Sequence, residues 1–140
     1  MRFLVPTDGS RPATRALQYV LELAARCDVR VQVLLLNVQT PLSSHVAGFI
    51  SRDVISEYHA EQGGEALAGS LELLRDAGVD FEPLLKTGHH AETICAVADS
   101  EAVDGIVMGT RGHGGVAGLL MGSVASQVLA GTSVPLTLIK

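Results

Sequence analysis

Short runs of consecutive apolar residues alternate along the chain with longer segments in which apolar residues recur every three or four positions. A continuous apolar run bounded by polar or turn-forming residues is typical of a strand that is buried on both faces, as in a parallel sheet. The pattern predicts five strands, at residues 3–5, 29–38, 81–86, 105–108 and 134–139.

The intervening segments have the spacing of helices, and the first of them carries its own start signal. Ser10 is a candidate N-cap, and Pro12 falls in the first turn, where a missing N–H group costs nothing. Apolar residues at positions 17–25 form a single stripe, which predicts an amphipathic helix that ends near residue 27.

Later helices are predicted over residues 51–77, over residues 91–100 and after the last glycine-rich loop. Two adjacent glycines at 63–64 indicate a kink or a break in the first of these. Gly78 is placed to end the same helix in a left-handed conformation. Residues 39–48 contain proline, serine and glycine, and they are expected to form a loop.

Strands that alternate with helices predict an α/β fold, a single doubly wound five-stranded parallel sheet with helices on both faces. Two polar loops follow strands directly, residues 7–10 after the first strand and the glycine-rich loop after the fourth. Such sheets bind ligands beyond the carboxyl ends of their strands. If both loops line one site, the first and fourth strands are neighbours, which favours the order 3-2-1-4-5 over a flavodoxin-like 2-1-3-4-5. The length predicts one domain, residues 1–140.

The segment at residues 106–129 predicts a strand, a glycine-rich loop and a helix, and eight of the chain's fifteen glycines lie between Gly105 and Gly131. Glycines let backbone N–H groups approach an anion closely at the positive end of the following helix. Arg111 adds a permanent cation, and Ser123 is well placed to cap that helix. These features predict a phosphate cradle, with a tight turn that binds nothing as the alternative.

The spacing excludes two familiar phosphate-binding loops. A P-loop requires a lysine after its last glycine, and the only lysines are Lys86 and Lys140. Residues 112–117 fit the dinucleotide pattern G-x-G-x-x-[G/A], but no acidic residue follows about 20 positions later, so that fingerprint is rejected as well.

Charge and composition narrow the function further. The net charge is −5 and the chain has no basic run, which argues against binding to nucleic acid or to an anionic membrane. There is no signal-peptide pattern and no apolar run of membrane-spanning length, so a cytoplasmic location is expected. Cys27 and Cys95 are isolated, which predicts no disulfide framework, and both are expected to be small buried apolar groups.

The remaining polar residues indicate binding more clearly than catalysis, and no catalytic residue is predicted. Asp8 directly follows the first strand, where a contact to a nucleoside, an outer contact to a phosphate-bound metal and a turn-forming role are all consistent with its position. His113 either contacts phosphate or faces water. No residue near it in the sequence is placed to orient its ring as a general base. His89 and His90 lack metal-ligand spacing, so no metal-binding residues are predicted.

Both ends of the chain resemble the universal stress protein family, in residues 5–10 (V-P-T-D-G-S), 105–112 (G-I-V-M-G-T-R-G) and 134–139 (V-P-L-T-L-I). The specific part is the motif G-x2-G-x9-G-[S/T], which is fitted without a gap by Gly109, Gly112, Gly122 and Ser123. The resemblance spans essentially the whole chain, although residues 39–63 are generic. Family members that carry this motif bind ATP, and members that lack it do not.

The resemblance implies a five-stranded parallel α/β domain and a homodimer joined through the last strand, with ATP and Mg as the expected ligands. Adenine and ribose are then expected to lie against Pro6, Thr7, Asp8 and Val38, with Met108 beneath the base. Ribose and phosphates are expected to be held by Gly109, Gly112, Gly122, Ser123 and Val124. The position of Arg111 varies in the family, so its phosphate contact is predicted from its place in the glycine loop alone. His90 stands where many relatives have proline and is expected not to touch the site.

Three functions compete at this stage. The leading hypothesis is an ATP-binding stress or regulatory protein whose nucleotide state, ATP or AMP, alters its binding to a protein partner that the sequence does not identify. The second is a slow ATPase or an autophosphorylating enzyme assisted by Asp8 or His113. The third is a dimeric interaction module whose glycine loop is empty.

Overall fold

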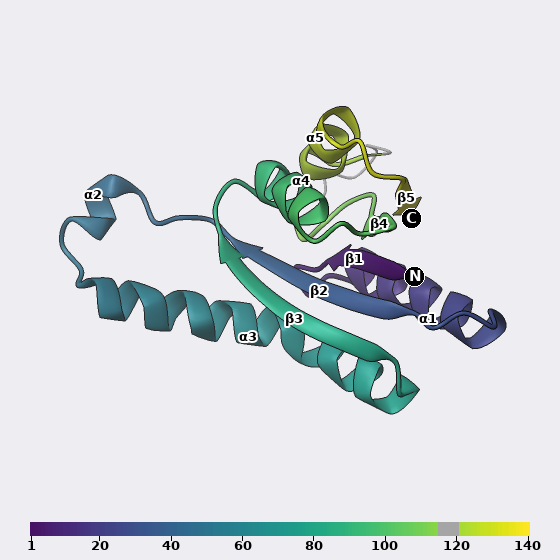
Figure 1. Ribbon diagram of the computed structural model, residues 1–140. Helices are drawn as coiled ribbons and strands as arrows, with labels where there is room; N and C mark the ends of the chain where they lie inside the picture. The colour runs from purple at the N-terminus through teal and green to yellow at the C-terminus, as the bar shows by residue number, and fades with distance from the viewer. Residues whose placement is uncertain (115–120) are drawn as a thin grey trace.

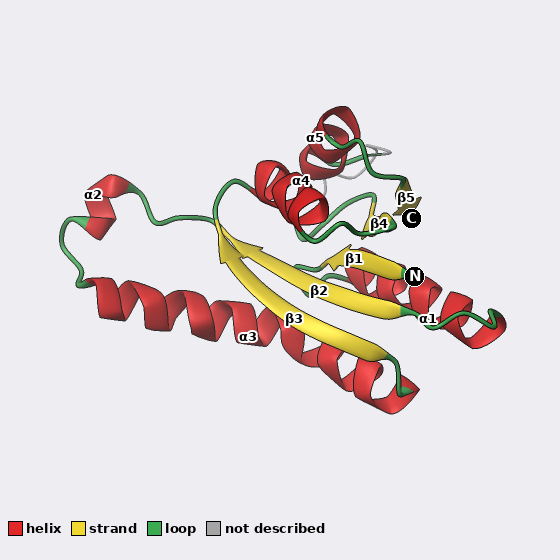
Figure 2. Ribbon diagram, in the orientation of Figure 1, coloured by secondary structure: helices red, strands yellow, loops and turns green. Residues whose placement is uncertain are grey.

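Five parallel strands form one sheet at the centre of the computed structural model (Figures 1 and 2), which describes residues 1–114 and 121–140. The strands are β1 (Arg2–Pro6), β2 (Gln32–Gln39), β3 (Asp80–Thr87), β4 (Gly105–Gly109) and β5 (Leu136–Ile139). Their order across the sheet is β3-β2-β1-β4-β5, and each neighbouring pair is parallel. The predicted α/β fold and the strand order 3-2-1-4-5 are therefore confirmed.

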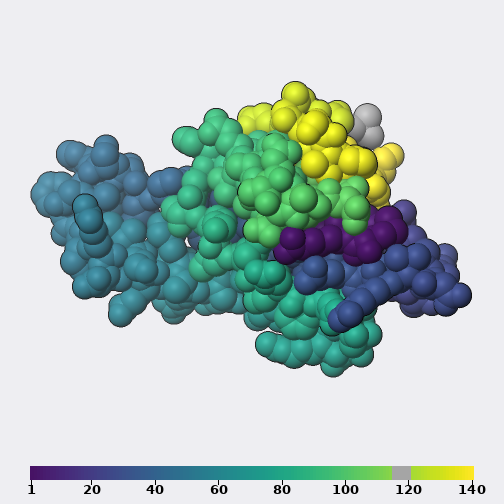
Figure 3. Space-filling view, in the orientation of Figure 1, coloured from purple at the N-terminus to yellow at the C-terminus, as the bar shows by residue number. Residues whose placement is uncertain are grey.

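Helices cover both faces of this sheet. In the described residues they are α1 (Arg11–Arg26), α2 (Ser44–Ala47), α3 (Arg52–Ala77), α4 (His90–Ser100) and α5 (Ser123–Gly131). Figure 1 shows α1 and α3 below the sheet and α4 and α5 above it. In the space-filling view of Figure 3, α4 and α5 lie together as one green and yellow layer. Within the two described ranges, none of the helices is long and apolar enough to cross a membrane.

Alternate residues of each central strand pack into two separate cores. Leu4 and Leu34 lie in the cluster with α4 and α5, whereas Val5 and Leu35 lie in the cluster with α1 and α3. All four side chains are fully buried. Because both faces of β1 and β2 are covered, the continuous apolar runs in the sequence correspond to doubly buried strands.

Two predicted helix ends are confirmed. Ser10 is the N-cap of α1, and its Oγ accepts a hydrogen bond from the Ala13 N–H at 3.5 Å. Gly78 ends α3 with φ at 64°, a left-handed conformation that glycine adopts without steric cost.

A kink or a break was expected at residues 63–64, and the break is wrong, because α3 is continuous from Arg52 to Ala77. Gly63 is buried against β3, and a Cβ atom there would overlap the side chain of Leu85. This glycine therefore permits a close contact between helix and sheet. Gly64 has open space in the same position.

Three further expectations need correction. The second strand begins at Gln32 and not at residue 29, because Val29 is half exposed and lies before the sheet. The predicted loop at residues 39–48 contains the short helix α2. Cys27 is exposed and Cys95 is only partly buried, so the expectation that both cysteines are buried is wrong.

Candidate functional site

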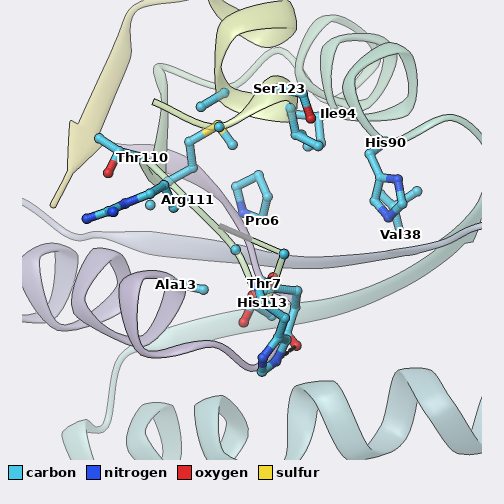
Figure 4. A pocket seen from close by; sticks show the side chains of 18 of the residues that line it. Pro6, Thr7, Ala13, Val38, His90, Ile94, Thr110, Arg111, His113 and Ser123 are labelled. Carbon is cyan, nitrogen blue, oxygen red and sulfur yellow. Dashed lines mark hydrogen bonds between the residues drawn. The ribbon is translucent and has the colours of Figure 1, made fainter. Parts of the chain in front are cut away.

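A cavity of about 510 Å³ opens at the carboxyl ends of β1, β2 and β4, against the first turns of α4 and α5 (Figure 4). It is lined by all eleven residues that were predicted to hold a nucleotide, namely Pro6, Thr7, Asp8, Val38, Met108, Gly109, Arg111, Gly112, Gly122, Ser123 and Val124. These residues come from three distant parts of the sequence. They meet because β1 lies between β2 and β4 in the sheet.

The end of β1 is fixed by buried hydrogen bonds. The Thr7 N–H donates to the Leu36 carbonyl at 2.8 Å, and the Thr7 carbonyl accepts a hydrogen bond from Asn37 Nδ2 at 2.8 Å. Asn37 Oδ1 in turn accepts a hydrogen bond from Gln39 Nε2 at 2.7 Å. Thr7 and Asn37 are both buried, so this wall of the cavity is held rigidly by satisfied polar groups.

Asp8 connects the β1–α1 turn to the glycine loop. One carboxylate oxygen accepts a hydrogen bond from the Ser10 N–H at 3.0 Å, and the other accepts one from the His113 N–H at 3.0 Å. The His113 ring also contacts this turn, with Nε2 at 2.9 Å from the Asp8 carbonyl oxygen. That oxygen can only accept, so Nε2 carries the proton of this hydrogen bond. The glycine loop is thus tied to the first strand across 105 residues.

The ionised form of Asp8 is favoured in the folded protein. Partial desolvation by the surrounding chain is the largest influence, and by itself it raises the pKa of Asp8. Hydrogen bonds from Ser10 and from the His113 backbone, together with the charge of the His113 ring, outweigh it. The net effect is a pKa of Asp8 below its ordinary value of 3.8, so the carboxylate is an acceptor at neutral pH.

Two glycines of the motif are required by close contacts within the protein. A Cβ atom on Gly109 would lie 2.8 Å from Cβ of Pro12, and one on Gly112 would overlap the Asp8 carboxylate. The loop therefore runs directly over the start of α1 and against Asp8. Glycine at these two positions brings the loop backbone into the cavity wall.

The start of α5 faces the same cavity. Gly122 is the N-cap, with extended backbone and no side-chain capping bond, so the expectation that Ser123 caps the helix is wrong. Ser123 is instead the first helical residue. The N–H groups of Ser123, Val124 and Ala125 have no carbonyl partner within the helix, because a first turn lacks the preceding residues that would accept. All three residues line the cavity.

Arg111 lies beside the N-cap of α5, since a Cβ on Gly122 would be 3.6 Å from Cα of Arg111. The side chain is exposed. Figure 4 shows it running along the cavity wall and away from His90. The backbone of Arg111 therefore lies beside the start of α5.

Other lining residues were not predicted. His90, expected to be clear of the site, is a wall residue at the first position of α4, and Figure 4 places it beside Val38. The further lining residues are Ala13, Leu36, Ile94, Thr110, His113, Gly114 and Ala125. Among them His113 was considered as a phosphate contact. Apart from Thr110, the others are apolar residues or glycine, for which the sequence holds no chemical signal.

The whole chain, residues 1–140, matches the profile described as the universal stress protein family. Over 139 residues it is 30% identical to the universal stress protein MJ0531 of Methanocaldococcus jannaschii, and the alignment covers 99% of this chain and 81% of that protein.

Solved structures show the same fold. The structure of hypothetical protein MJ0577 superposes with a TM-score of 0.85 at 27% identity, covering 99% of this chain and 94% of the other. A family protein from Arabidopsis thaliana, At3g01520, solved with AMP bound, superposes with a TM-score of 0.71 at 22% identity, covering 100% of this chain and 91% of the other. With a full-length family match, a relative of 30% identity and the shared fold, this chain belongs to the universal stress protein family.

Proposed function

We propose that this protein binds ATP in the cavity at the strand ends and acts as a nucleotide-dependent regulator, whose bound nucleotide alters its contacts with a protein partner. The observation that carries the proposal is the first turn of α5, whose N–H groups have no acceptor within the helix and whose residues line the same cavity as the described part of the glycine loop. A helix start of this kind attracts an anion through its N–H groups and its dipole. A phosphate chain is the ligand that matches it.

The opposite side of the cavity suits a purine base. Pro6, Val38, Met108 and Ile94 supply buried apolar surface to the cavity. The Asp8 carboxylate is ionised and provides an acceptor for ribose hydroxyl groups. Mg²⁺ would enter with the phosphates, because that ion is usually held by phosphate oxygens, water and one or two carboxylates.

The phosphate end is assigned to the motif residues. In this proposal the chain of phosphates is held by Gly109, Gly112, Gly122, Ser123 and Val124, with Arg111 adding a positive charge. The family protein from Arabidopsis thaliana was solved with AMP bound, which supports an adenine nucleotide as the ligand class.

A homodimer through β5 is part of the same proposal. β5 is an edge strand of the sheet, next to β4 only. Its Pro135 and Ile139 carbonyls accept hydrogen bonds from the β4 side at 2.8 Å. The backbone N–H and C=O groups of successive residues point to opposite sides of a strand. Those of Leu136 and Leu138 therefore point to the free edge of the sheet. An edge of this kind pairs readily with a second chain.

The position of the phosphates can be tested by removing one N–H group from α5. In Ser123→Pro the helix is kept, because proline suits the first helical position and Gly122 already has the extended conformation that a residue before proline prefers. Ser123→Ala, which removes only the hydroxyl, is the matched control. We expect Ser123→Pro to bind Mg-ATP about tenfold more weakly than Ser123→Ala in titration calorimetry, the effect of losing one charge-assisted hydrogen bond.

Adenosine makes this experiment specific, because it has the base and ribose but no phosphate. Both variants should bind adenosine like the wild type. Equal Mg-ATP affinities for Ser123→Pro and Ser123→Ala would show that the phosphates lie elsewhere. A single-turnover incubation with radiolabelled Mg-ATP follows ADP and labelled protein in parallel, and hydrolysis that is lost in Asp8→Asn would favour the slow ATPase over a binding protein.

A further inference from the structure

A second cavity, of about 770 Å³, lies on the other side of Asp8 from the phosphate-binding end. Its walls are the end of β2, the loop that leads into α2, and the first half of α3. It shares Asp8, Val38, His90 and His113 with the first cavity, so the two cavities are neighbours. We propose that the second cavity binds a hydroxyl-rich ligand, a sugar or a polyol, next to the nucleotide. This site has residues of its own and goes beyond the proposed function.

The charges around the second cavity exclude an anionic occupant. Its described lining residues include the two carboxylates of Asp8 and Glu65, and none of them is lysine or arginine. The basic groups are limited to the imidazoles of His90 and His113, and His113 already contacts the Asp8 carbonyl. A second phosphate or a carboxylate would therefore meet repulsion and no compensating cation. A neutral ligand with many hydroxyl groups avoids this cost.

Helix α3 presents a polar stripe to the cavity. Tyr58, Gln62 and Glu65 all line it, and their spacing of four and three residues places them on one face of the helix. Together they offer a half-exposed aromatic ring, an amide and a carboxylate. Amides and carboxylates exchange hydrogen bonds with hydroxyl groups, and an aromatic ring covers the apolar C–H face of a sugar. This combination of groups matches a pyranose or a furanose ring.

The wall formed by the end of β2 adds a hydrogen-bond acceptor with a fixed orientation. The Gln39 amide nitrogen donates to the buried Asn37 at 2.7 Å, and Asn37 is itself held by the Thr7 carbonyl. The side-chain amide of Gln39 is therefore oriented, and its Oε1 has no hydrogen-bond donor among the described residues. Thr40 and Ser43 add hydroxyl groups from the loop.

The floor of the cavity is fixed by close backbone packing. Gly9 lies at φ of 80°, and a Cβ there would be 3.3 Å from the Ala66 carbonyl oxygen. The β1–α1 turn thus rests directly on α3, one residue after Glu65. Figure 4 shows His113 pointing from the first cavity toward α3. The polar stripe is consequently held at a constant distance from Asp8 and from the nucleotide cavity.

Two sources of the sugar are compatible with this position. The ligand is either a free monosaccharide or polyol, or a second sugar carried by the nucleotide itself. Titration calorimetry of the full chain distinguishes them, with glucose, ribose and myo-inositol as free probes and with ADP-ribose compared against ADP. Glucose 6-phosphate tests the charge argument, because it adds only an anion to glucose.

The variants are chosen outside the nucleotide cavity. Tyr58→Ala and Glu65→Ala each remove part of the stripe, and Glu61→Ala is the matched control on the same helix, since Glu61 is exposed and does not line either cavity. We expect each stripe variant to weaken sugar binding by about tenfold, the loss of one or two hydrogen bonds or of one ring contact. Mg-ATP should bind equally to the wild type and all three variants.

Each outcome decides the proposal. A saturable free sugar whose affinity falls in the stripe variants supports a separate ligand. ADP-ribose binding about tenfold more tightly than ADP, with the same loss in the variants, supports a sugar carried on the nucleotide. The proposal is overturned if neither probe is sensitive to the stripe, or if glucose 6-phosphate binds more tightly than glucose. A wild type that fails to bind Mg-ATP would refute the proposed function alone, because the free-sugar titrations need no nucleotide.

Discussion

At the scale of single residues, the close contact of Gly112 with Asp8 explains why position 112 requires glycine. A Cβ atom there would overlap the Asp8 carboxylate, whereas one on Gly64 in α3 meets no atom of the described residues within 4 Å. We predict that Gly112→Ala folds but binds Mg-ATP about tenfold more weakly, because Asp8 or the loop must move and a charge-assisted hydrogen bond is lost. Gly64→Ala, at a position that lines neither cavity, should bind like the wild type. Titration calorimetry that gives both variants the same reduced affinity would contradict this reading of the contact.

Asp8 also predicts a pH dependence of stability. The pKa of Asp8 is lowered in the folded state, so the unfolded chain binds the proton more readily. The stabilisation from the ionised carboxylate is complete above the unfolded value of 3.8 and is lost as the pH falls through the lower folded pKa. The Tm advantage of the wild type over Asp8→Asn should therefore be constant from about pH 7 to about pH 5 and shrink in stronger acid.

Circular dichroism melts across this range measure the difference directly. The control is Asp76→Asn, at an exposed position on α3, whose Tm should follow that of the wild type at each pH. An advantage over Asp8→Asn that grows on acidification would mean that the folded protein favours the protonated carboxyl group.

At the scale of elements, the two central glycines of α3 should respond differently to alanine. Gly64 has open space, so Gly64→Ala should stabilise the protein by about 0.5–1 kcal/mol through helix propensity alone. Gly63→Ala gains the same propensity but forces the Leu85 side chain to move, and we expect it to be about 1 kcal/mol less stable than Gly64→Ala. Repeating both substitutions in a Leu85→Ala background should remove the difference, which urea unfolding measures. Identical effects of the two glycines in both backgrounds would contradict the proposed contact.

The elements themselves were largely predictable from the sequence, and the exceptions have physical causes. Doubly buried strands leave continuous apolar runs, so β1, β2 and β4 were evident. The start of β2 was misjudged because Val29 is an apolar residue, yet its side chain is half exposed in the structure. Helix α2 is only four residues long, too short for apolar periodicity, although the Ser43 Oγ accepts a hydrogen bond from the Val46 N–H at its start. The break expected at residues 63–64 failed because tertiary contact with β3 overrides glycine's low propensity.

The residues of the candidate site that come directly after a strand were predictable from the sequence. The polar residues after β1 and the glycine loop after β4 could line one site only if these two strands were neighbours, and they are neighbours in the sheet. His90 was misjudged because it reaches the cavity from the first turn of α4, and nothing in the sequence around it indicates that direction. The link from Asp8 to His113 spans 105 residues and depends on the backbone path of the loop, which local patterns do not contain.

At the scale of the whole molecule, strand order determines which loops can cooperate. β1 occupies the centre of the sheet, between β2 and β4, and the chain leaves β1 at Thr7 and Asp8. The turn after β1 therefore borders the glycine loop on one side and the end of β2 and α3 on the other. Both cavities include Asp8 for this reason. If both cavities are occupied as proposed, the two ligands lie beside the same carboxylate.

The free edge at β5 leads to a prediction about assembly. Thr137 is exposed on this strand, and Thr87 is exposed on β3 at the opposite edge. If two copies pair through β5, Thr137→Lys brings a charge into the strand pairing and should convert the dimer to a monomer, because edge lysines oppose pairing between sheets. Thr87→Lys makes the same change at the edge that the proposal leaves free, so it should remain dimeric. Sedimentation velocity at micromolar concentration separates the 14.6 kDa chain from its dimer. A wild type that sediments as a monomer, or dissociation by Thr87→Lys instead, would refute assembly through β5.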